Sequence, residues 1–273
     1  RFDIYSKKGE QGFFIGKKVG KNYIDLKKFD TVEEARTFKK ASQKELVALL
    51  EKYKEIPNER KESNAPRVGI DHRNGANVTT EAFSDTFGFR GVQFGNYVEG
   101  DKRQTDLNDT YDALMDIAGV LNLPPKSLSL NGELGLAFGA RGIGGKRAPS
   151  AHFEPGTIVI NLTKNRGAGS LAHELFHGID NYFARMRGEK GSYLTERPYK
   201  RGEGVRSEMV EAFAGIMDAI GASGMFKRAR RLDQARTKDY WSKKVEMAAR
   251  SFEAFIINKL QDQNASNEYL ANI

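Results

Sequence analysis

Residues 171–180 read Leu-Ala-His-Glu-Leu-Phe-His-Gly-Ile-Asp, and this stretch decides how the fold is interpreted. It contains the pattern His-Glu-x-x-His. Because positions four apart lie on one face of an α-helix, His173 and His177 can offer their imidazoles to the same tetrahedral Zn²⁺ ion. Glu174 would project beside them, toward a water molecule on the metal. The stretch therefore predicts a helix that carries two metal ligands and a proton acceptor.

The flanking residues favour one continuous helix over residues 169–187. Ser170 is a suitable N-cap, and Gly188 is a suitable residue just past the end. Opposite the histidines, an apolar stripe would pack into a core; it consists of Leu171, Leu175, Ile179, Tyr182 and Met186. The alternative is a pair of histidines held in the core by hydrogen bonds. Since the pair accounts for two of only four histidines and brackets a glutamate, we favour the metal site.

The composition limits the other possibilities. A chain of 273 residues, 39% hydrophobic and 29% charged, can bury a large core, alone or with a small second module. Because there is no cysteine, zinc would have to be held by His, Asp or Glu. We find no segment typical of a membrane span or a signal sequence, and we expect a cytoplasmic protein without membrane contact. The net charge of +8 is compatible with nucleic-acid contact or with an ordinary charged surface.

We predict a division into a small module at residues 1–60 and a main domain at residues 67–273. Residues 12–16 and 23–26 predict two strands, and residues 31–55 predict a long charged helix. The polar segment 57–66 would be the linker. The lysines of the module indicate a solvated helix face more than a track for nucleic acid. Because the chain begins at Arg1 rather than Met, we expect it to be part of a larger polypeptide.

Within the main domain, residues 67–98 show no clear periodicity and predict only turns and short extended pieces. Residues 110–121 predict an amphipathic helix, and residues 157–162 a strand that leads into the histidine helix. The rest, residues 205–222 and 239–261, would be helical. The glycine-rich stretch 139–145 has Gly145 where a phosphate-binding P-loop needs lysine, so it predicts a close-packed turn. Arg141 and Arg147 are candidates to face a substrate.

Catalytic zinc usually has three protein ligands and one open position, so a third ligand is needed. Asp180 shares the histidine stripe, but its short side chain suits it better to hold a histidine ring. Glu208 begins a helix whose small residues would allow close approach to another helix, namely Ala212, Gly215 and Ala219. Glu246 ranks first, Glu208 second and Asp180 third. Glu211 and Glu253 are predicted to be surface charges.

The ranking of Glu246 rests on a resemblance. The sequence Glu-Met-Ala-Ala-Arg-Ser-Phe, which starts there, looks like the glutamate helix of gluzincin metallopeptidases, in which a small residue one turn later lets the carboxylate reach the metal. The order of a strand and then the His-Glu-x-x-His helix resembles the zincins more generally. In zincins an edge strand just upstream lies along the active-site cleft and pairs with an extended peptide.

Several blocks also resemble the large polyvalent protein-associated domain 1, which occurs in very large proteins of phages and conjugative elements. They are residues 87–98, 136–142, 151–155, 240–253 and the block around the histidine helix. The resemblance extends from about Arg67 onward. It implies an α+β, zincin-like domain of a phage or plasmid polyvalent protein, acting in the cytoplasm of the host cell.

The expected activity is that of a zinc metallopeptidase with a protein or peptide substrate. His173, His177 and Glu246 would bind Zn²⁺, and Glu174 would take a proton from the attacking water. His152 is a candidate to stabilise the developing oxyanion, unless it makes a structural hydrogen bond in a tight turn. Two alternatives stay open. The chain is a nucleic-acid-associated binding module with a structural or vestigial zinc site, or a protease that processes its own polyprotein.

Overall fold

The computed structural model describes residues 2–7, 10–19, 22–54, 60–61, 63–95, 100–140, 151–162, 169–234 and 239–273. The chain is an α+β protein, as predicted. It divides into two compact units. Unit 1 consists of Arg1–Glu59 with Ile220–Met247, and unit 2 consists of Arg60–Ala219 with Ala248–Ile273. The N-terminal module is thus grouped with a later segment of the chain, and the division falls inside the continuous helices α6 (Ser207–Ala222) and α8 (Lys244–Asp262).

Unit 1 contains an antiparallel sheet in the order β1-β2-β3, formed by Asp3–Tyr5, Phe13–Val19 and Asn22–Phe29. The sequence predicted two strands in this module, and the structure contains a third, β1. The predicted single helix over residues 31–55 is two helices, α1 (Val32–Ala41) and α2 (Gln43–Lys54), because Ser42 leaves the helical conformation. This break lets α1 pack on β2 and α2 on β3. The core of the sheet and helices consists of Phe2, Ile15, Ile24, Ala35, Leu46 and Leu50.

Unit 2 is built around a sheet in the order β4-β5-β7-β6, formed by Val92–Phe94, Gly135–Phe138, Val159–Leu162 and Ala151–Glu154. β4, β5 and β7 are parallel, whereas β6 runs antiparallel to β7. The predicted strand at residues 157–162 is therefore an inner strand. The edge strand beside it is β6, which precedes it in the sequence and carries His152.

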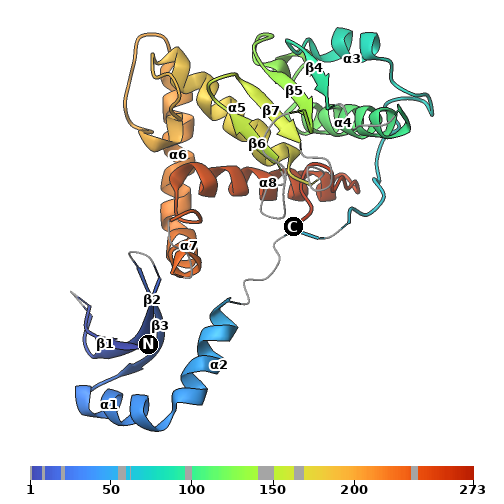
Figure 1. Ribbon diagram of the computed structural model, residues 1–273. Helices are drawn as coiled ribbons and strands as arrows, with labels where there is room; N and C mark the ends of the chain where they lie inside the picture. Colours follow the sequence, from blue (N-terminus) through green and yellow to red (C-terminus); the bar gives the residue numbers. More distant parts are fainter. Residues whose placement is uncertain are drawn as a thin grey trace. The chain divides into compact units, whose positions relative to one another are not determined.

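The helices of unit 2 bury the sheet. α5 (Leu171–Met186) packs against β6 and β7, and α3 (Thr80–Phe87) packs against α4 (Gly100–Leu121) (Figure 1). Short 3-10 helices lie at Pro125–Ser129 and Leu194–Glu196. α4 starts ten residues before the predicted helix at residue 110, and α3 lies in a region predicted to be turns. The best-buried core side chains include Phe83, Phe87, Leu114, Ile117, Leu136, Ile160, Leu171 and Leu175.

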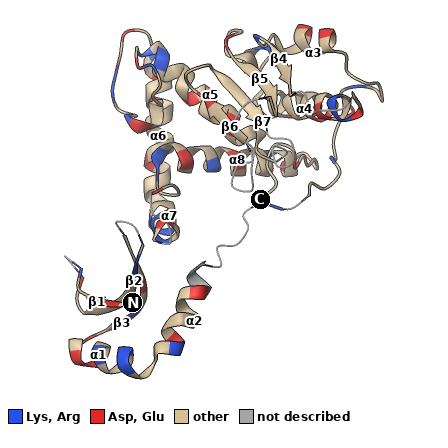
Figure 2. Cartoon of the chain, viewed as in Figure 1, with Lys and Arg blue, Asp and Glu red and all other residues tan. Residues whose placement is uncertain are grey.

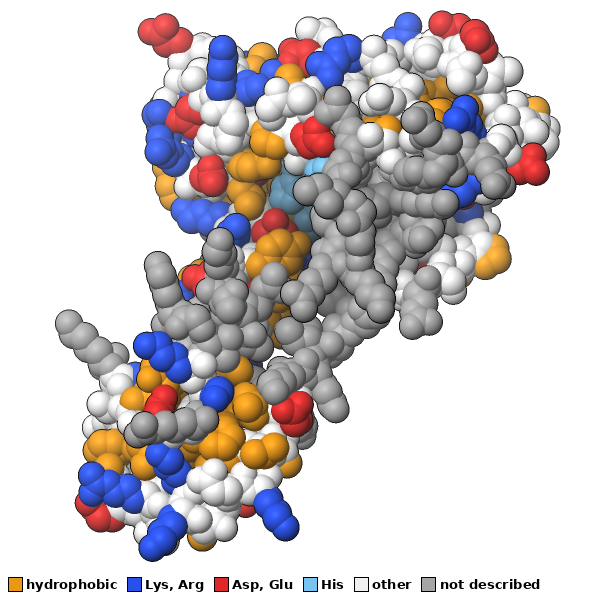
Figure 3. All heavy atoms as spheres, viewed as in Figure 1, with side chains coloured by type: hydrophobic (Ala, Val, Ile, Leu, Met, Phe, Trp, Pro, Cys, Tyr) orange, Lys and Arg blue, Asp and Glu red, His pale blue; other side chains and the backbone are white. Residues whose placement is uncertain are grey.

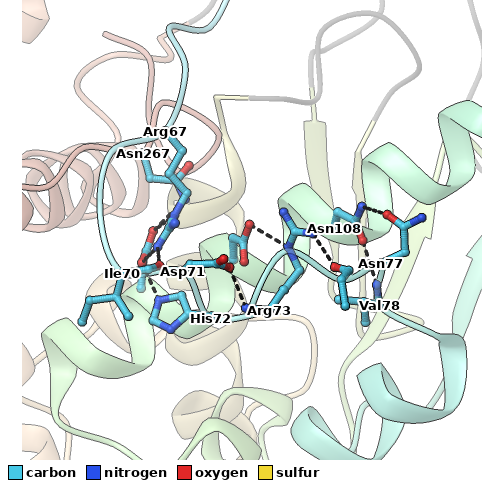
Figure 4. Close-up of polar contacts among 12 residues, drawn as sticks. Arg67, Ile70, Asp71, His72, Arg73, Asn77, Val78, Asn108 and Asn267 are labelled. Carbon is cyan, nitrogen blue, oxygen red and sulfur yellow. Dashed lines mark hydrogen bonds and ion pairs between the residues drawn. The ribbon is translucent and has the colours of Figure 1, made fainter.

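A strap of residues 67–78 lies along α4 (Figure 4). Arg67 donates to Asp116 at 2.7 Å, and His72 contacts the same carboxylate at 2.9 Å. Further along, Arg73 pairs with Asp112 at 3.0 Å. Positions four apart share one face of a helix, so α4 offers the strap a row of polar side chains. The row consists of Gln104, Asn108, Asp112 and Asp116.

The C-terminal segment closes the start of α5. Backbone N–H groups of Gly169 and Ala172 donate to the carbonyls of Tyr269 and Leu270, at 2.9 and 3.0 Å. The first N–H groups of a helix have no partner within the helix, so this segment supplies what a capping side chain would. Gly169 has φ +94°, and a Cβ there would lie 2.6 Å from Oδ1 of Asn272. Glycine is therefore required at this junction.

Among the helices that the structure describes, no single one has the length and apolar character needed to cross a bilayer.

Candidate metal centre

The histidine helix forms nearly as predicted. α5 spans Leu171–Met186, and Gly188 follows its end with φ +87°. Ser170 is at the N-cap position but makes no side-chain capping bond. Of the predicted apolar stripe, Leu171 and Leu175 are fully buried, whereas Met186 is 43% exposed. The first half of the helix is buried on the histidine face as well.

His173 and His177 are both buried, and their Nε2 atoms face each other at 3.1 Å. With Zn–N bonds of about 2.0–2.1 Å, two nitrogens on a tetrahedral ion lie about 3.3 Å apart. The pair is therefore preorganised to within a few tenths of an ångström of zinc geometry. The same separation suits an N–H···N hydrogen bond, which is the structural alternative. In the view of Figure 3, histidine atoms are visible in a hollow of the surface.

Glu253 fixes the orientation of the first ring. Its Oε2 lies 3.1 Å from Nδ1 of His173, and its side chain is 1% exposed. A ring that donates from Nδ1 presents Nε2 as a lone pair, in this case toward His177. Glu253 thus contacts a candidate ligand, and the prediction that it is a surface charge is wrong. Sequence reasoning missed it because its burial depends on packing against α5.

Arg60 completes this contact. Its guanidinium donates to Oε1 of Glu253 at 2.7 Å and to the carbonyl of Gly169. Burial raises the pKa of Glu253, but the hydrogen bond and charge of His173, together with Arg60, outweigh it and hold that pKa below its ordinary value. The carboxylate is therefore ionised at neutral pH. No spacing in the sequence signals Arg60, which is more than a hundred residues from either partner.

Glu246 lies on the same face of α8 as Glu253, since a spacing of seven residues is close to two helical turns. One ligand atom from each of His173, His177 and Glu246 lies within 4.8 Å of the other two. Imidazole nitrogens and a carboxylate oxygen are the donors that zinc takes in sites without cysteine. The structure thus brings together the three residues that rank first as ligands, and their chemistry fits this ion.

Glu174 is 7% exposed and lies on α5 between the two histidines. Asp180 is fully buried further along, where it accepts from the backbone N–H and the hydroxyl of Thr195 at 2.9 and 2.5 Å. Burial raises the pKa of Asp180 to about 6, against the opposing hydrogen bonds from Thr195. This aspartate therefore fixes the turn after α5, whereas the expectation was that it would hold a histidine ring.

The remaining candidates lie elsewhere. Glu208 and Glu211 are exposed, as are the small residues Ala212, Gly215 and Ala219. A Cβ added at Gly215 would meet nothing within 4 Å, so the expected close approach of another helix is not found among the described residues. Glu208 is accordingly absent from the cluster of potential ligands. Glu211 is a surface charge, as predicted.

His152 lies on β6 opposite Asn161, with Nε2 3.1 Å from Oε1 of Glu154. Its contact is local, as in the alternative interpretation, and its role toward an oxyanion stays a prediction. Tyr193, which the sequence did not single out, has its ring centroid 5.7 Å from that of His177. Arg141 and Arg147, with most of the glycine-rich stretch, lie outside the described residues.

Two family models match the chain. The model of large polyvalent protein-associated domain 5 matches residues 1–86, and that of large polyvalent protein-associated domain 1 matches residues 232–273. The second match contains Glu246 and Glu253 but neither histidine of α5, so it is shorter than the resemblance expected from Arg67 onward. No curated protein and no solved structure matches the chain. Over both matched segments, the chain is similar to the polyvalent-protein-associated domains of phages and mobile elements.

Proposed function

We propose that this chain contains a zinc-dependent peptidase domain in which His173, His177 and Glu246 hold the metal. The observation that carries the proposal is the pair of facing Nε2 atoms, 3.1 Å apart, with the far side of one ring bound to a buried carboxylate. Carboxylate–histidine–metal arrangements of this kind fix both the tautomer and the orientation of a ligand. The carboxylate of Glu246 converges on the same point.

The structural alternative is a hydrogen-bonded chain of Glu253, His173 and His177. Such a chain needs only one carboxylate. One N–H lies between the two rings, and the other, on Nδ1 of His173, points outward to Glu253. The site instead places two glutamates of α8 around the histidines, with Arg60 as the partner of the inner one. Two imidazoles and a carboxylate that converge on one point are the donor set that zinc takes in sites without cysteine, and this favours the metal site.

Zinc held here would supply Lewis acidity for amide hydrolysis, polarising the scissile carbonyl and making water more acidic. The chain's own residues then have separate tasks. Glu174 accepts the proton of the attacking water and returns it to the leaving amine. Glu253 keeps His173 in the tautomer that presents Nε2. Among the described strands β6 lies at the edge of the sheet, and its outer backbone groups would pair with an extended peptide, antiparallel or parallel to that strand.

The substrate we propose is a protein or peptide, and the place of action is the cytoplasm of a host cell. Both follow from the peptidase chemistry and from the similarity to polyvalent-protein-associated domains. Incubation of the Glu174→Gln protein with the wild-type protein separates cleavage of other proteins from cleavage of the chain itself. Fragments of the variant would indicate processing of its own polypeptide.

Metal analysis after purification is the direct test. We expect about one zinc ion per chain, and loss of zinc in His173→Ala and His177→Ala, because each ring supplies one of three protein ligands. His72→Asn is the matched control, since His72 lies on the strap over α4 and should leave the zinc content unchanged. Stoichiometric zinc in both α5 variants would contradict the site.

Hydrolysis has its own test. Glu174→Gln should retain zinc and fold normally but lose cleavage of a fluorogenic peptide library by about 10²–10⁴-fold, since an amide cannot accept the proton. Zinc retention together with wild-type cleavage would remove Glu174 from its role. Retained zinc with no cleavage by the wild type would favour a structural site.

A further inference from the structure

Unit 1 contains a short, strongly basic helix, α7, which spans Met225–Asp233 and reads Met-Phe-Lys-Arg-Ala-Arg-Arg-Leu-Asp. Ala229 and Asp233 are buried and mark its inner side. The exposed side chains form a continuous arc around the rest of the helix at 100° per residue. They are Phe226, Lys227, Arg228, Arg230 and Arg231. In Figure 2 the ribbon of α7 carries the blue of lysine and arginine.

The acidic residue of α7 does not offset this charge at the surface. Asp233 is 2% exposed and accepts backbone N–H bonds from Tyr240, Trp241 and Ser242, each at 2.8 Å. Its carboxylate therefore organises the segment before α8. In the part of the chain that the structure describes, Lys227, Arg228 and Arg230 form no ion pair with a carboxylate. The face they share is thus uniformly positive.

An aromatic ring lies among these charges. Phe226 is 46% exposed, and the guanidinium carbon of Arg230 is 5.8 Å from its ring centroid. Contact between an aromatic ring and water is unfavourable, so a partner that covers the exposed ring of Phe226 would gain binding free energy. Basic groups that follow a phosphate backbone, combined with an aromatic side chain on which a base stacks, are the elements of single-strand recognition.

We propose that α7 binds single-stranded nucleic acid, with its basic side chains on the phosphates and Phe226 against a base. At 1.5 Å per residue, α7 is about 13 Å long. This matches about four phosphates at the spacing of one strand in B-form geometry. The proposal is independent of the peptidase activity, because none of these residues belongs to the metal centre.

Other polyanions fit the helix less well. A helix that lies on an anionic membrane needs a wide apolar face to bury among the lipids. Phe226, at 46%, is the most exposed of the large apolar side chains of α7, and Met225 and Leu232 are only partly exposed, so α7 has no wide apolar face. An acidic peptide could neutralise the charges but presents no row of flat bases for the ring to stack on.

Fluorescence anisotropy with a fluorescein-labelled fifteen-residue oligothymidylate, titrated with the full chain at several salt concentrations, tests this proposal. The variant Lys227→Gln, Arg228→Gln, Arg230→Gln removes three charges from α7. The matched control, Arg36→Gln, Lys40→Gln, Lys44→Gln, removes three exposed charges from α1 and α2 of the same unit. Circular dichroism melting confirms that both variants are folded.

We expect the α7 variant to bind at least ten-fold more weakly and its slope of log K against log salt to fall by about 2, as loss of three contacts to a single strand predicts. The control should bind like the wild type. Phe226→Ala should weaken binding with little change in the salt slope. Equal losses in both triple variants, or no binding by the wild type, would overturn the proposal. The proposal would also be overturned if phosphatidylserine vesicles or polyglutamate bound through α7 while oligothymidylate did not bind.

Discussion

At the scale of single residues, two glutamates of one helix have different tasks. Glu246 and Glu253 share a face of α8, yet Glu246 is half-buried among the candidate ligand atoms, whereas Glu253 is buried behind the ring of His173. A carboxylate bound to the metal contributes directly to affinity. A carboxylate behind a ligand contributes by orienting it and by raising its basicity.

The different positions of the two glutamates predict losses of zinc affinity that differ in size. Glu253→Ala should lower zinc affinity by about 10–100-fold, the usual loss when a partner of a ligand is removed. Glu246→Ala should lower it further, because a direct ligand is lost. Competition with a chromogenic chelator measures both. Glu208→Ala is the control, since Glu208 is exposed and away from the cluster. If Glu208→Ala releases zinc while Glu246→Ala retains it, the third ligand is wrongly assigned.

The raised pKa of Asp180 predicts that the stability of the protein depends on pH. Burial raises its pKa in the folded protein to about 6, above the ordinary value of 3.8. Folding therefore favours the protonated form. The contribution of Asp180 to stability is fully present below about pH 4 and is lost as the pH rises through 6. The cost of the ionised form approaches about 3 kcal/mol above pH 7.

Asp180→Asn removes this titration while keeping the shape of the side chain. Relative to the wild type, the variant should gain stability between pH 4 and pH 8, by up to about 3 kcal/mol. Urea denaturation at a series of pH values, with a chelator to exclude metal effects, measures the difference. A stability difference that is the same at every pH would show that Asp180 is ionised at no unusual cost.

At the scale of elements, the strap of residues 67–78 explains why a segment without periodicity is ordered. Its order comes from α4, whose polar row at four-residue spacing pairs with the strap. The apolar pattern of α4 is clear only from residue 110, so its first ten residues were not predicted. α3 did carry local signals, namely the N-cap Thr79 and Gly88 in the left-handed conformation at its end. The capping pattern therefore held information that apolar periodicity did not.

The strap predicts a loss of stability when its strongest pair is broken. Arg67→Met should destabilise unit 2 by about 1–3 kcal/mol, because the carboxylate of Asp116 stays buried while one charged partner is lost. His72 and Asn267, which also contact Asp116, limit the loss. Arg36→Met is the control: it breaks an exposed pair with Glu33, and should change stability by at most about 0.5 kcal/mol. If both variants lost the same free energy of unfolding in urea denaturation, the contact between Arg67 and Asp116 would contribute no more to stability than an exposed ion pair.

At the scale of the whole molecule, the candidate site could be predicted where one helix determines it. The positions of His173, His177 and Glu174 follow from spacing alone, whereas Glu246 was ranked ahead of Glu208 and Asp180 through a resemblance to the glutamate helix of gluzincins. Glu253 and Arg60 could not be found in this way, because they meet the histidines only through tertiary packing. For the same reason the edge strand was misplaced: sequence order does not show that β6 lies outside β7.

The closure of α5 by the C-terminal segment sets an order of events during synthesis. Gly169 and Ala172 are made roughly 100 residues before the carbonyls of Tyr269 and Leu270 that bind them. At about 5–20 residues per second, the delay on the ribosome is about 5–20 s. For most of that interval the histidines exist, while Glu246, Glu253 and the closing segment have not yet been synthesised.

We therefore expect zinc to bind only after Glu246, Glu253 and the closing segment have emerged from the ribosome. A nascent chain arrested at residue 240 should hold no zinc that survives a chelator, whereas one extended well past residue 273 should hold it. Equal retention by both would mean that α5 and its histidines suffice. The site would in that case need none of the residues that are synthesised last.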